Sequence, residues 1–88
     1  LFMLQKIYLN ALNQISNLGP KRIFYLLKLF NNNAKQVWQS PWTELKKTKL
    51  SDDILNKFLH ERTNIDPNKE WEKLVKLNIK IILHPKID

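Results

Sequence analysis

The stretch ISNLGPKR, residues Ile15 to Arg22, decides the fold because it joins two amphipathic segments through a tight turn. Gly19 can adopt the left-handed backbone conformation that most side chains exclude, and Asn17 is the non-glycine residue type that tolerates it best. Pro20 cannot continue a helix, but it suits the first turn of a new one, where its missing N–H costs nothing. The stretch therefore predicts a helix end, a turn and a helix start in quick succession.

Apolar residues repeat at helical spacing on both sides of this stretch. Residues 2–16 and residues 20–31 each carry one apolar stripe with the 3.6-residue period of a helix. The asparagines at 31–33 predict the end of the second helix, because asparagine tolerates the left-handed conformation of many helix exits. The two stripes consist of Ile7, Tyr8, Ala11, Leu12 and Ile15, and of Ile23, Leu26, Leu27 and Phe30.

Helix-start signals divide the rest of the chain. Ser40 and Asp66 each stand directly before a proline, and Ser51 stands before two aspartates, which favour the positive end of the helix dipole. All three are therefore expected to cap the N-terminus of a helix. The signals predict short helices over 34–38 and 41–46, and longer ones from Ser51 to Arg62 and over 67–77, with Asn78 as a left-handed stop.

The last segment has a different character. Residues 79–83 are rich in isoleucine and lie between Asn78 and Pro85, which is typical of a buried strand. One strand cannot make a sheet, so it either pairs with another chain or begins a sheet that continues beyond Asp88. We interpret residues 1–64 as a small helical domain and residues 65–88 as the helix and first strand of a second, truncated domain.

The positive charge is confined to the first half of the chain. The net charge is +7, and residues 1–50 carry all of it, with Glu44 as their single acidic residue. Such an uneven distribution indicates a surface that faces a polyanion. The 13 lysines, 2 arginines and 10 asparagines also fit the codon bias of an AT-rich genome. That bias does not explain why the excess lies in one half, and this favours the functional interpretation.

Several classes of protein are excluded or disfavoured. The chain has no cysteine, and its two histidines, His60 and His84, lie far apart, so we expect no disulfide, no metal site and no cofactor. No Ser-His-Asp arrangement and no glycine-rich phosphate loop is present, so we expect no enzyme. The longest apolar run, residues 23–27, is too short to cross a membrane. Without a targeting signal, the cytoplasm is the expected location.

The turn resembles the helix-hairpin-helix element, whose usual hairpin is apolar-Pro-Gly-apolar-Gly-Pro-Lys. This chain matches the second half of that pattern, from Leu18 to Lys21. In the first half, Ser16 occupies the position of the usual proline and Asn17 that of the first glycine. Free N–H groups at the start of the second helix, with two basic side chains beside them, would bind backbone phosphate. The candidate nucleic-acid-binding residues are Asn17, Leu18, Gly19, Pro20, Lys21 and Arg22. The alternative is a tight connector without a ligand.

The order of segments along the whole chain resembles the N-terminal region of the DNA-processing protein A family (DprA, also called Smf). In that family a helix like 67–77 runs into Lys-Leu-Gly-Ile, a short strand and an Asp-Pro turn before a Rossmann-like domain. In this chain Asn78 replaces the glycine, and His84 stands near the usual Gly-Asp. The resemblance implies a SAM-like or helix-hairpin-helix domain followed by the opening of a truncated Rossmann-like domain.

The resemblance also implies a function. DprA proteins are bacterial cytoplasmic proteins that bind incoming single-stranded DNA and hand it to RecA during natural transformation. The expected partners are DNA, contacted through its backbone, and RecA through the full-length protein, with self-association left open. In the family the main DNA-binding surface lies in the Rossmann-like domain, so this region is an accessory. The alternative is a protein-interaction or packing module that makes no DNA contact of its own.

Overall fold

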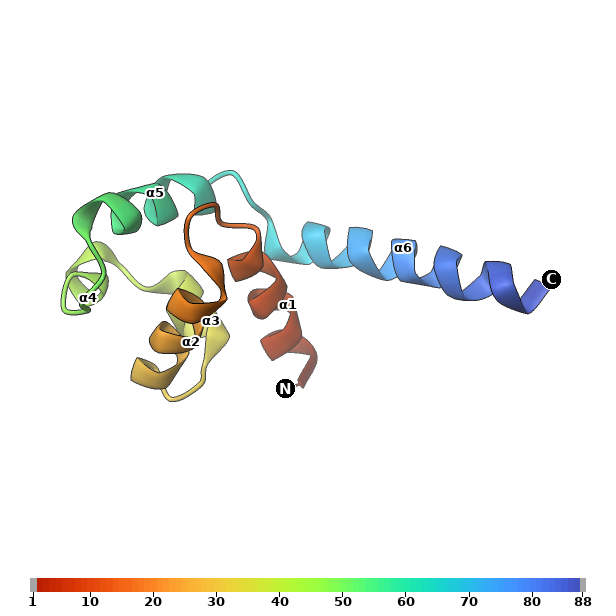
Figure 1. The fold of residues 1–88 in the computed structure, drawn as a ribbon, viewed down its shortest axis with the longest axis horizontal. Coiled ribbons are helices and arrows are strands. Elements are labelled where there is room, and N and C mark those ends of the chain that lie inside the picture. The colour runs from red at the N-terminus through yellow and green to blue at the C-terminus, as the bar shows by residue number, and fades with distance from the viewer. Residues whose placement is uncertain (1, 88) are drawn as a thin grey trace.

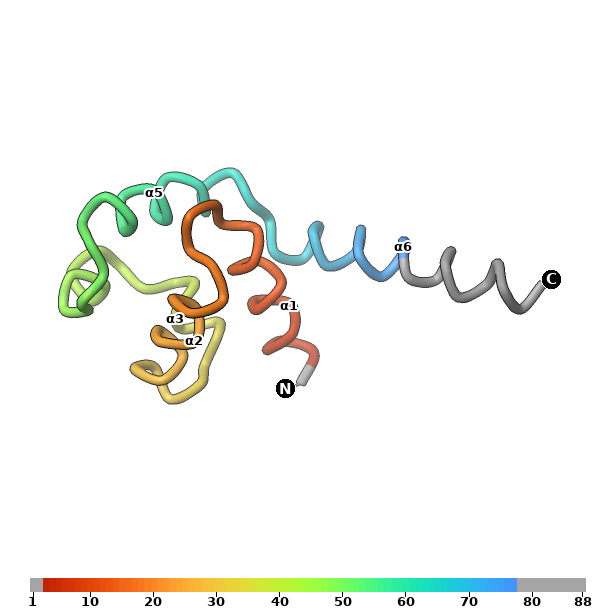
Figure 2. Tube along the Cα trace, in the orientation of Figure 1, coloured from red at the N-terminus to blue at the C-terminus, as the bar shows by residue number. Residues whose placement is uncertain are grey.

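The computed structural model describes the backbone of residues 2–87 and the side chains of residues 3–77, and it is mainly helical (Figure 1). The described chain forms helices α1 (Phe2–Asn13), α2 (Gly19–Leu29), α3 (Ala34–Gln39), α4 (Trp42–Leu45), α5 (Asp52–Arg62) and α6 (Pro67–Ile87). The expectation of a small helical domain is confirmed. The path of the chain in Figure 2 places the turn between α1 and α2 beside the C-terminal end of α5.

One apolar core joins α1 to α5. Its centre is the pair Trp38 and Phe58, whose rings meet edge to face with centroids 5.9 Å apart. Both rings are buried, with Trp38 7% and Phe58 1% exposed. Both predicted stripes supply buried side chains. The core consists of Ala11, Leu12, Ile15, Leu18, Ile23, Leu26, Leu27, Ala34, Val37, Trp38, Leu45, Leu55 and Phe58.

Asparagine and serine side chains set the helix boundaries much as the sequence predicts. Asn31 and Asn32 have φ of 54° and 61°, so the run after α2 does adopt the left-handed conformation. The side chain of Asn33 then accepts a hydrogen bond from the N–H of Gln36 and starts α3. Ser51 caps α5 in the same way through the N–H of Ile54. Local capping chemistry therefore accounts for where these helices begin and end.

The role predicted for Ser40 is wrong. Its hydroxyl donates to the carbonyl oxygen of Gln36 at 2.6 Å, and it therefore closes α3 instead of starting α4. The N-cap of α4 is Pro41, which has no side-chain hydrogen bond to offer. A serine within one turn of a helix end can bond backward to a carbonyl oxygen as well as forward to an N–H, and Ser40 makes the backward bond.

Gln5 ties the first helix to the third. Its side-chain nitrogen donates to the carbonyl oxygen of Asn32 at 2.7 Å, and its side-chain oxygen accepts from the N–H of Ala34 at 3.0 Å. Because the Gln5 amide satisfies one backbone group of the turn before α3 and one of α3 itself, it fixes how α3 lies across α1.

The final helix differs from the predicted strand. Asp66 caps α6 as expected, accepting from the N–H groups of Asn68 and Lys69. The helix does not stop at Asn78 but continues to Ile87, so residues 79–83 are helical and the predicted strand is not observed. An isolated strand leaves its backbone N–H and C=O groups unpaired, whereas a helix pairs them internally. No other strand occurs within residues 2–87 to supply partners.

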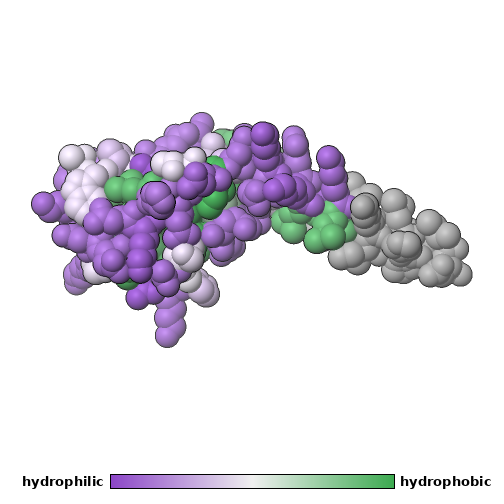
Figure 3. Space-filling model, turned by 90° about the horizontal axis from the view of Figure 1, so that it is seen from above, coloured by the Kyte–Doolittle hydropathy of each residue, from purple (hydrophilic) through white to green (hydrophobic). Residues whose placement is uncertain are grey.

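Figure 3 shows one face of the molecule, on which polar residues predominate and apolar residues show in smaller areas over the helical body and on α6. On α6, the side chains of Val75 and Leu77 are exposed. α6 begins beside the C-terminal end of α1 and points away from the other helices (Figure 1). None of the helices in the described part of the chain combines the length and the apolar character needed to cross a membrane.

Arg62, the last residue of α5, holds the end of α3. One of its guanidinium nitrogens donates to the carbonyl oxygens of Trp38 and Ser40, both at 2.7 Å. The guanidinium carbon lies 5.3 Å from the centroid of the Phe58 ring, within range of a cation–π contact. Burial lowers the pKa of Arg62 from its ordinary value, yet guanidinium remains charged. One side chain thus supports both the backbone and the centre of the core.

We expect Arg62→Ala to lower the free energy of unfolding by about 1–3 kcal/mol, because two half-buried carbonyl oxygens lose their donor. Urea unfolding followed by circular dichroism measures the change. The control is Lys57→Ala, which removes an exposed ion pair to Asp53 from the same helix and should cost less than about 0.5 kcal/mol. Equal losses in the two variants would contradict a clamping role for Arg62.

Candidate nucleic-acid interface

The turn between α1 and α2 has the backbone conformation that the sequence predicts. Asn17 has φ of 66° and Gly19 has φ of 74°, both in the left-handed region. Leu18 lies between them and is 1% exposed, so its side chain is anchored in the core. The two left-handed residues reverse the chain on either side of this anchor. The candidate residues Asn17, Leu18 and Gly19 thus build the turn, and Leu18 offers no side chain to a ligand.

The start of α2 is open to solvent. The helix begins at Gly19 with Pro20 in its first turn, and neither an acidic residue nor a side-chain hydrogen bond caps it. Within the described residues, the N–H groups of Asn17 and Gly19 have no hydrogen-bond partner. Unpaired N–H groups and the positive end of the helix dipole favour an anion at this place.

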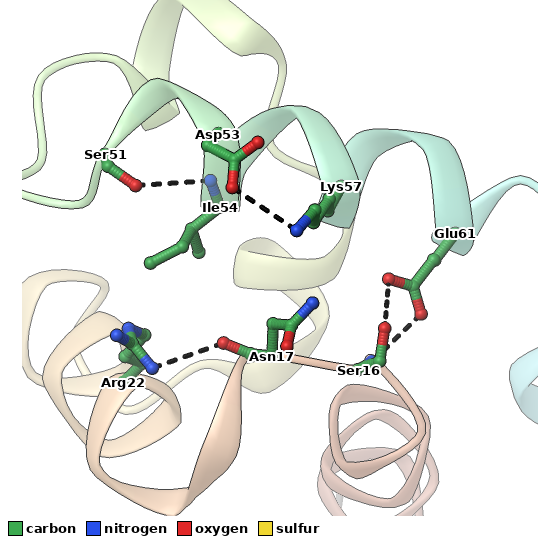
Figure 4. Close-up of polar contacts among 8 residues, drawn as sticks. All are labelled: Ser16, Asn17, Arg22, Ser51, Asp53, Ile54, Lys57 and Glu61. Atoms are coloured by element: carbon green, nitrogen blue, oxygen red, sulfur yellow. Dashed lines mark hydrogen bonds and ion pairs between the residues drawn. The ribbon is translucent and has the colours of Figure 1, made fainter.

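The two basic candidates behave differently. Arg22 bends back over the turn, and its guanidinium donates to the carbonyl oxygen of Asn17 at 3.2 Å (Figure 4). The same nitrogen also donates to the carbonyl oxygen of Leu18 at 3.5 Å. Lys21 is exposed, and no ion pair of the described residues involves it. Arg22 therefore contributes its charge to the site while also holding the turn, and Lys21 is the side chain that can move toward a ligand.

A carboxylate from α5 also reaches the turn. One oxygen of Glu61 accepts from the N–H of Ser16 at 2.9 Å, and the other accepts from the Ser16 hydroxyl at 2.6 Å (Figure 4). Chiefly the hydroxyl bond, and next the backbone bond, lower the pKa of the Glu61 carboxyl from its ordinary value. This contact fixes the turn against α5, and it places one negative charge beside the candidate phosphate site.

A second basic segment lies beside α2. The N–H of Lys49 donates to the hydroxyl oxygen of Tyr25 at 2.9 Å, which joins the loop between α4 and α5 to the middle of α2. The lysines of that loop, Lys46, Lys47 and Lys49, are exposed. Lys21 and Lys28 on α2 are exposed as well. The fold therefore gathers basic residues that are about 25 positions apart in the chain onto neighbouring elements.

Glu61 and Tyr25 were not identified from the sequence. Their partners, Ser16 and Lys49, stand 45 and 24 residues away. No local spacing connects residues at such separations, and each side chain also fits an ordinary position on an amphipathic helix. The position of the lysine loop next to α2 likewise follows only from the fold.

We expect Gly19→Ala to lower the free energy of unfolding by about 1 kcal/mol. An added Cβ meets no atom within 4 Å, so the cost is the left-handed backbone and not a clash. Asn17→Gly is the matched variant, and it should keep or raise stability because glycine adopts φ of 66° freely. Urea unfolding compares the two. Unchanged stability of Gly19→Ala would mean that the turn relaxes to another conformation.

The Glu61 contact predicts a dependence of stability on pH. Because the folded state lowers the pKa of Glu61, its contribution is present above the ordinary value of 4.5 and is lost as the pH falls through the lower folded value. Glu61→Gln should therefore lose less stability than the parent chain as the pH falls below 4.5. Ser16→Ala removes the hydroxyl donor to Glu61, and this variant should likewise lose less stability than the parent chain as the pH falls. Parallel pH profiles, measured by thermal unfolding, would contradict the contact.

No protein-family model, no curated protein and no solved structure matches the chain. The similarity to the DprA N-terminal region therefore rests on the order of segments in the sequence. Function has to be argued from the geometry and charge of the turn, of α2 and of the lysine loop.

Proposed function

We propose that the chain is an accessory nucleic-acid-binding domain that contacts DNA backbone through the start of α2. The observation that carries the proposal is the uncapped N-terminus of this helix with Lys21 and Arg22 in its first turn. The unpaired N–H groups, the helix dipole and the two cations all attract an anion to this place. Contacts of this kind recognise phosphate, so binding depends weakly on base sequence and strongly on salt.

The distribution of charge supports the same surface. Residues 1–50 carry the whole net charge of +7, and the Tyr25–Lys49 contact brings the lysine loop beside α2. The ion pairs formed by the described side chains involve Lys47, Lys57 and Lys73, so Lys21, Lys28 and Lys49 keep their charge available. A strand that follows α2 would meet these lysines after it leaves the turn.

The wider role that we propose follows the resemblance to DprA. The domain would assist a cytoplasmic protein that binds single-stranded DNA and helps to load RecA during natural transformation or recombination. Residues 65–88 would then open a Rossmann-like domain, and residues 79–83 would form a strand once neighbouring strands of that sheet are present to pair with them.

A second candidate function is a packing module without DNA contact. The exposed apolar side chains of Val75 and Leu77 on α6 favour it, as does the Glu61 carboxylate beside the turn. In that case the turn serves only to join α1 and α2, and α6 contacts a following domain or a second copy.

The salt dependence of DNA binding tests the proposal. We expect weak binding of a single-stranded oligonucleotide, measured by fluorescence anisotropy, and a shallower salt dependence in the double variant Lys21→Gln, Arg22→Gln. Two lost phosphate contacts reduce the slope of log affinity against log salt by about 1.4. The matched control is Lys69→Gln, Lys76→Gln, which removes the same charge from α6 and should change the slope less.

Two outcomes would count against the proposal. An unchanged slope in the Lys21, Arg22 variant, with its fold verified by circular dichroism, would exclude the turn as the contact. If DNA shifts no amide signals of residues 17–22 and a second copy of the chain shifts those of residues 74–77, the packing module is favoured.

A further inference from the structure

Phe24 is the most exposed large apolar side chain among the described residues. It lies on α2 and is 64% exposed, whereas its neighbours Ile23, Leu26 and Leu27 are buried. It projects from the helix that carries the proposed phosphate contacts, one turn after Pro20. The ring is not part of the core, and its exposure leaves it accessible to a ligand.

Positive charge surrounds the ring. Lys21 and Lys28 stand three residues before and four residues after Phe24, on the same face of the helix, and together with Tyr25 they line a shallow depression around it. The Lys28 ammonium lies 5.5 Å from the centroid of the Phe24 ring. Lys49 lies on the neighbouring loop, and its backbone N–H donates to the Tyr25 hydroxyl oxygen. The patch, which consists of Lys21, Phe24, Tyr25, Lys28 and Lys49, thus combines an exposed aromatic ring with three exposed lysines on two neighbouring elements.

We infer that Phe24 stacks on an unpaired base of single-stranded nucleic acid while Lys21, Lys28 and Lys49 contact its phosphates. This inference rests on the proposed nucleic-acid binding and adds a base contact to the backbone contacts at the turn. An apolar ring among cations suits a ligand that presents a flat π face and negative charge together, and a nucleotide strand does so. The bases of a duplex are already stacked on one another, so the patch selects single strands.

The existing Lys28–Phe24 contact does not oppose this role. A cation–π contact at an exposed site is weaker than the stacking of a base on an aromatic ring. Lys28 can therefore leave the ring for a phosphate when a base takes its place. The three lysines form no ion pair with the described side chains of residues 3–77, so no carboxylate has to be displaced.

The test compares how tightly the parent chain and patch variants bind nucleic-acid strands that have bases and strands that lack them. The probes are an oligothymidylate, an abasic strand of equal length and a duplex, each labelled for fluorescence anisotropy. We expect Phe24→Ala to weaken binding of the oligothymidylate about tenfold, because base–aromatic stacking is lost. The same variant should bind the abasic strand as the parent does, and the parent should prefer the oligothymidylate to the duplex.

Two further variants control for folding and for lost apolar surface. Phe24→Tyr keeps a ring and should retain the affinity of the parent. Leu29→Ala removes another exposed apolar side chain from α2 (52% exposed against 64% for Phe24), about 140° around the helix from Phe24, and should leave binding unchanged.

The outcomes separate this inference from the proposed function. If the parent binds all three probes and Phe24→Ala has no effect, stacking is excluded while backbone binding stands. Equal weakening on the abasic strand also excludes a base contact. If no probe binds, both proposals fail. If Phe24→Ala instead abolishes a concentration-dependent shift in sedimentation without affecting oligothymidylate binding, the patch is a contact between copies of the chain and the stacking role is overturned.

Discussion

The fold depends on one buried leucine held between two left-handed residues. Leu18 is buried in the core, and the left-handed residues Asn17 and Gly19 reverse the chain on either side of it. The chain therefore turns at the same place where it is anchored in the core. α1 and α2 can share a core only because this turn is short and tied on both sides. Arg22 secures it from α2 and Glu61 secures it from α5. The turn that would bind phosphate is therefore also the junction on which three helices depend.

In this chain the arginines make structural hydrogen bonds, whereas the lysines beside α2 lie exposed on the surface. Both arginines donate to backbone carbonyl oxygens, Arg22 at the turn and Arg62 at the end of α3. A guanidinium has several donors in a fixed plane and can satisfy two carbonyl groups at once, whereas an ammonium is a compact, strongly hydrated charge. The lysines beside α2 stay exposed. The positive charge of these lysines is therefore accessible to a polyanion.

The helical part of the fold could be predicted where the signals are local. Proline, glycine, asparagine and serine mark the turn, the exit from α2 and the start of α5, and the structure confirms them. The segment 79–83 shows the limit, because β-branched composition indicates a strand only if a partner strand exists to pair with it. The sequence predicts the turn of the candidate site, but it does not predict which other elements lie beside that turn. The contacts of Ser16 with Glu61 and of Tyr25 with Lys49 join distant positions, and only packing creates them.

The carboxylate beside the turn has a consequence for how long a ligand can stay. If a phosphate binds at the start of α2 as we propose, the helix dipole and two cations attract it, but the nearby Glu61 carboxylate repels it. Attraction from the surrounding lysines acts at long range and speeds arrival, whereas the local repulsion acts at contact and speeds departure. Such a balance favours rapid exchange over a long residence time. A domain built in this way suits the brief handling of a strand that another surface finally holds.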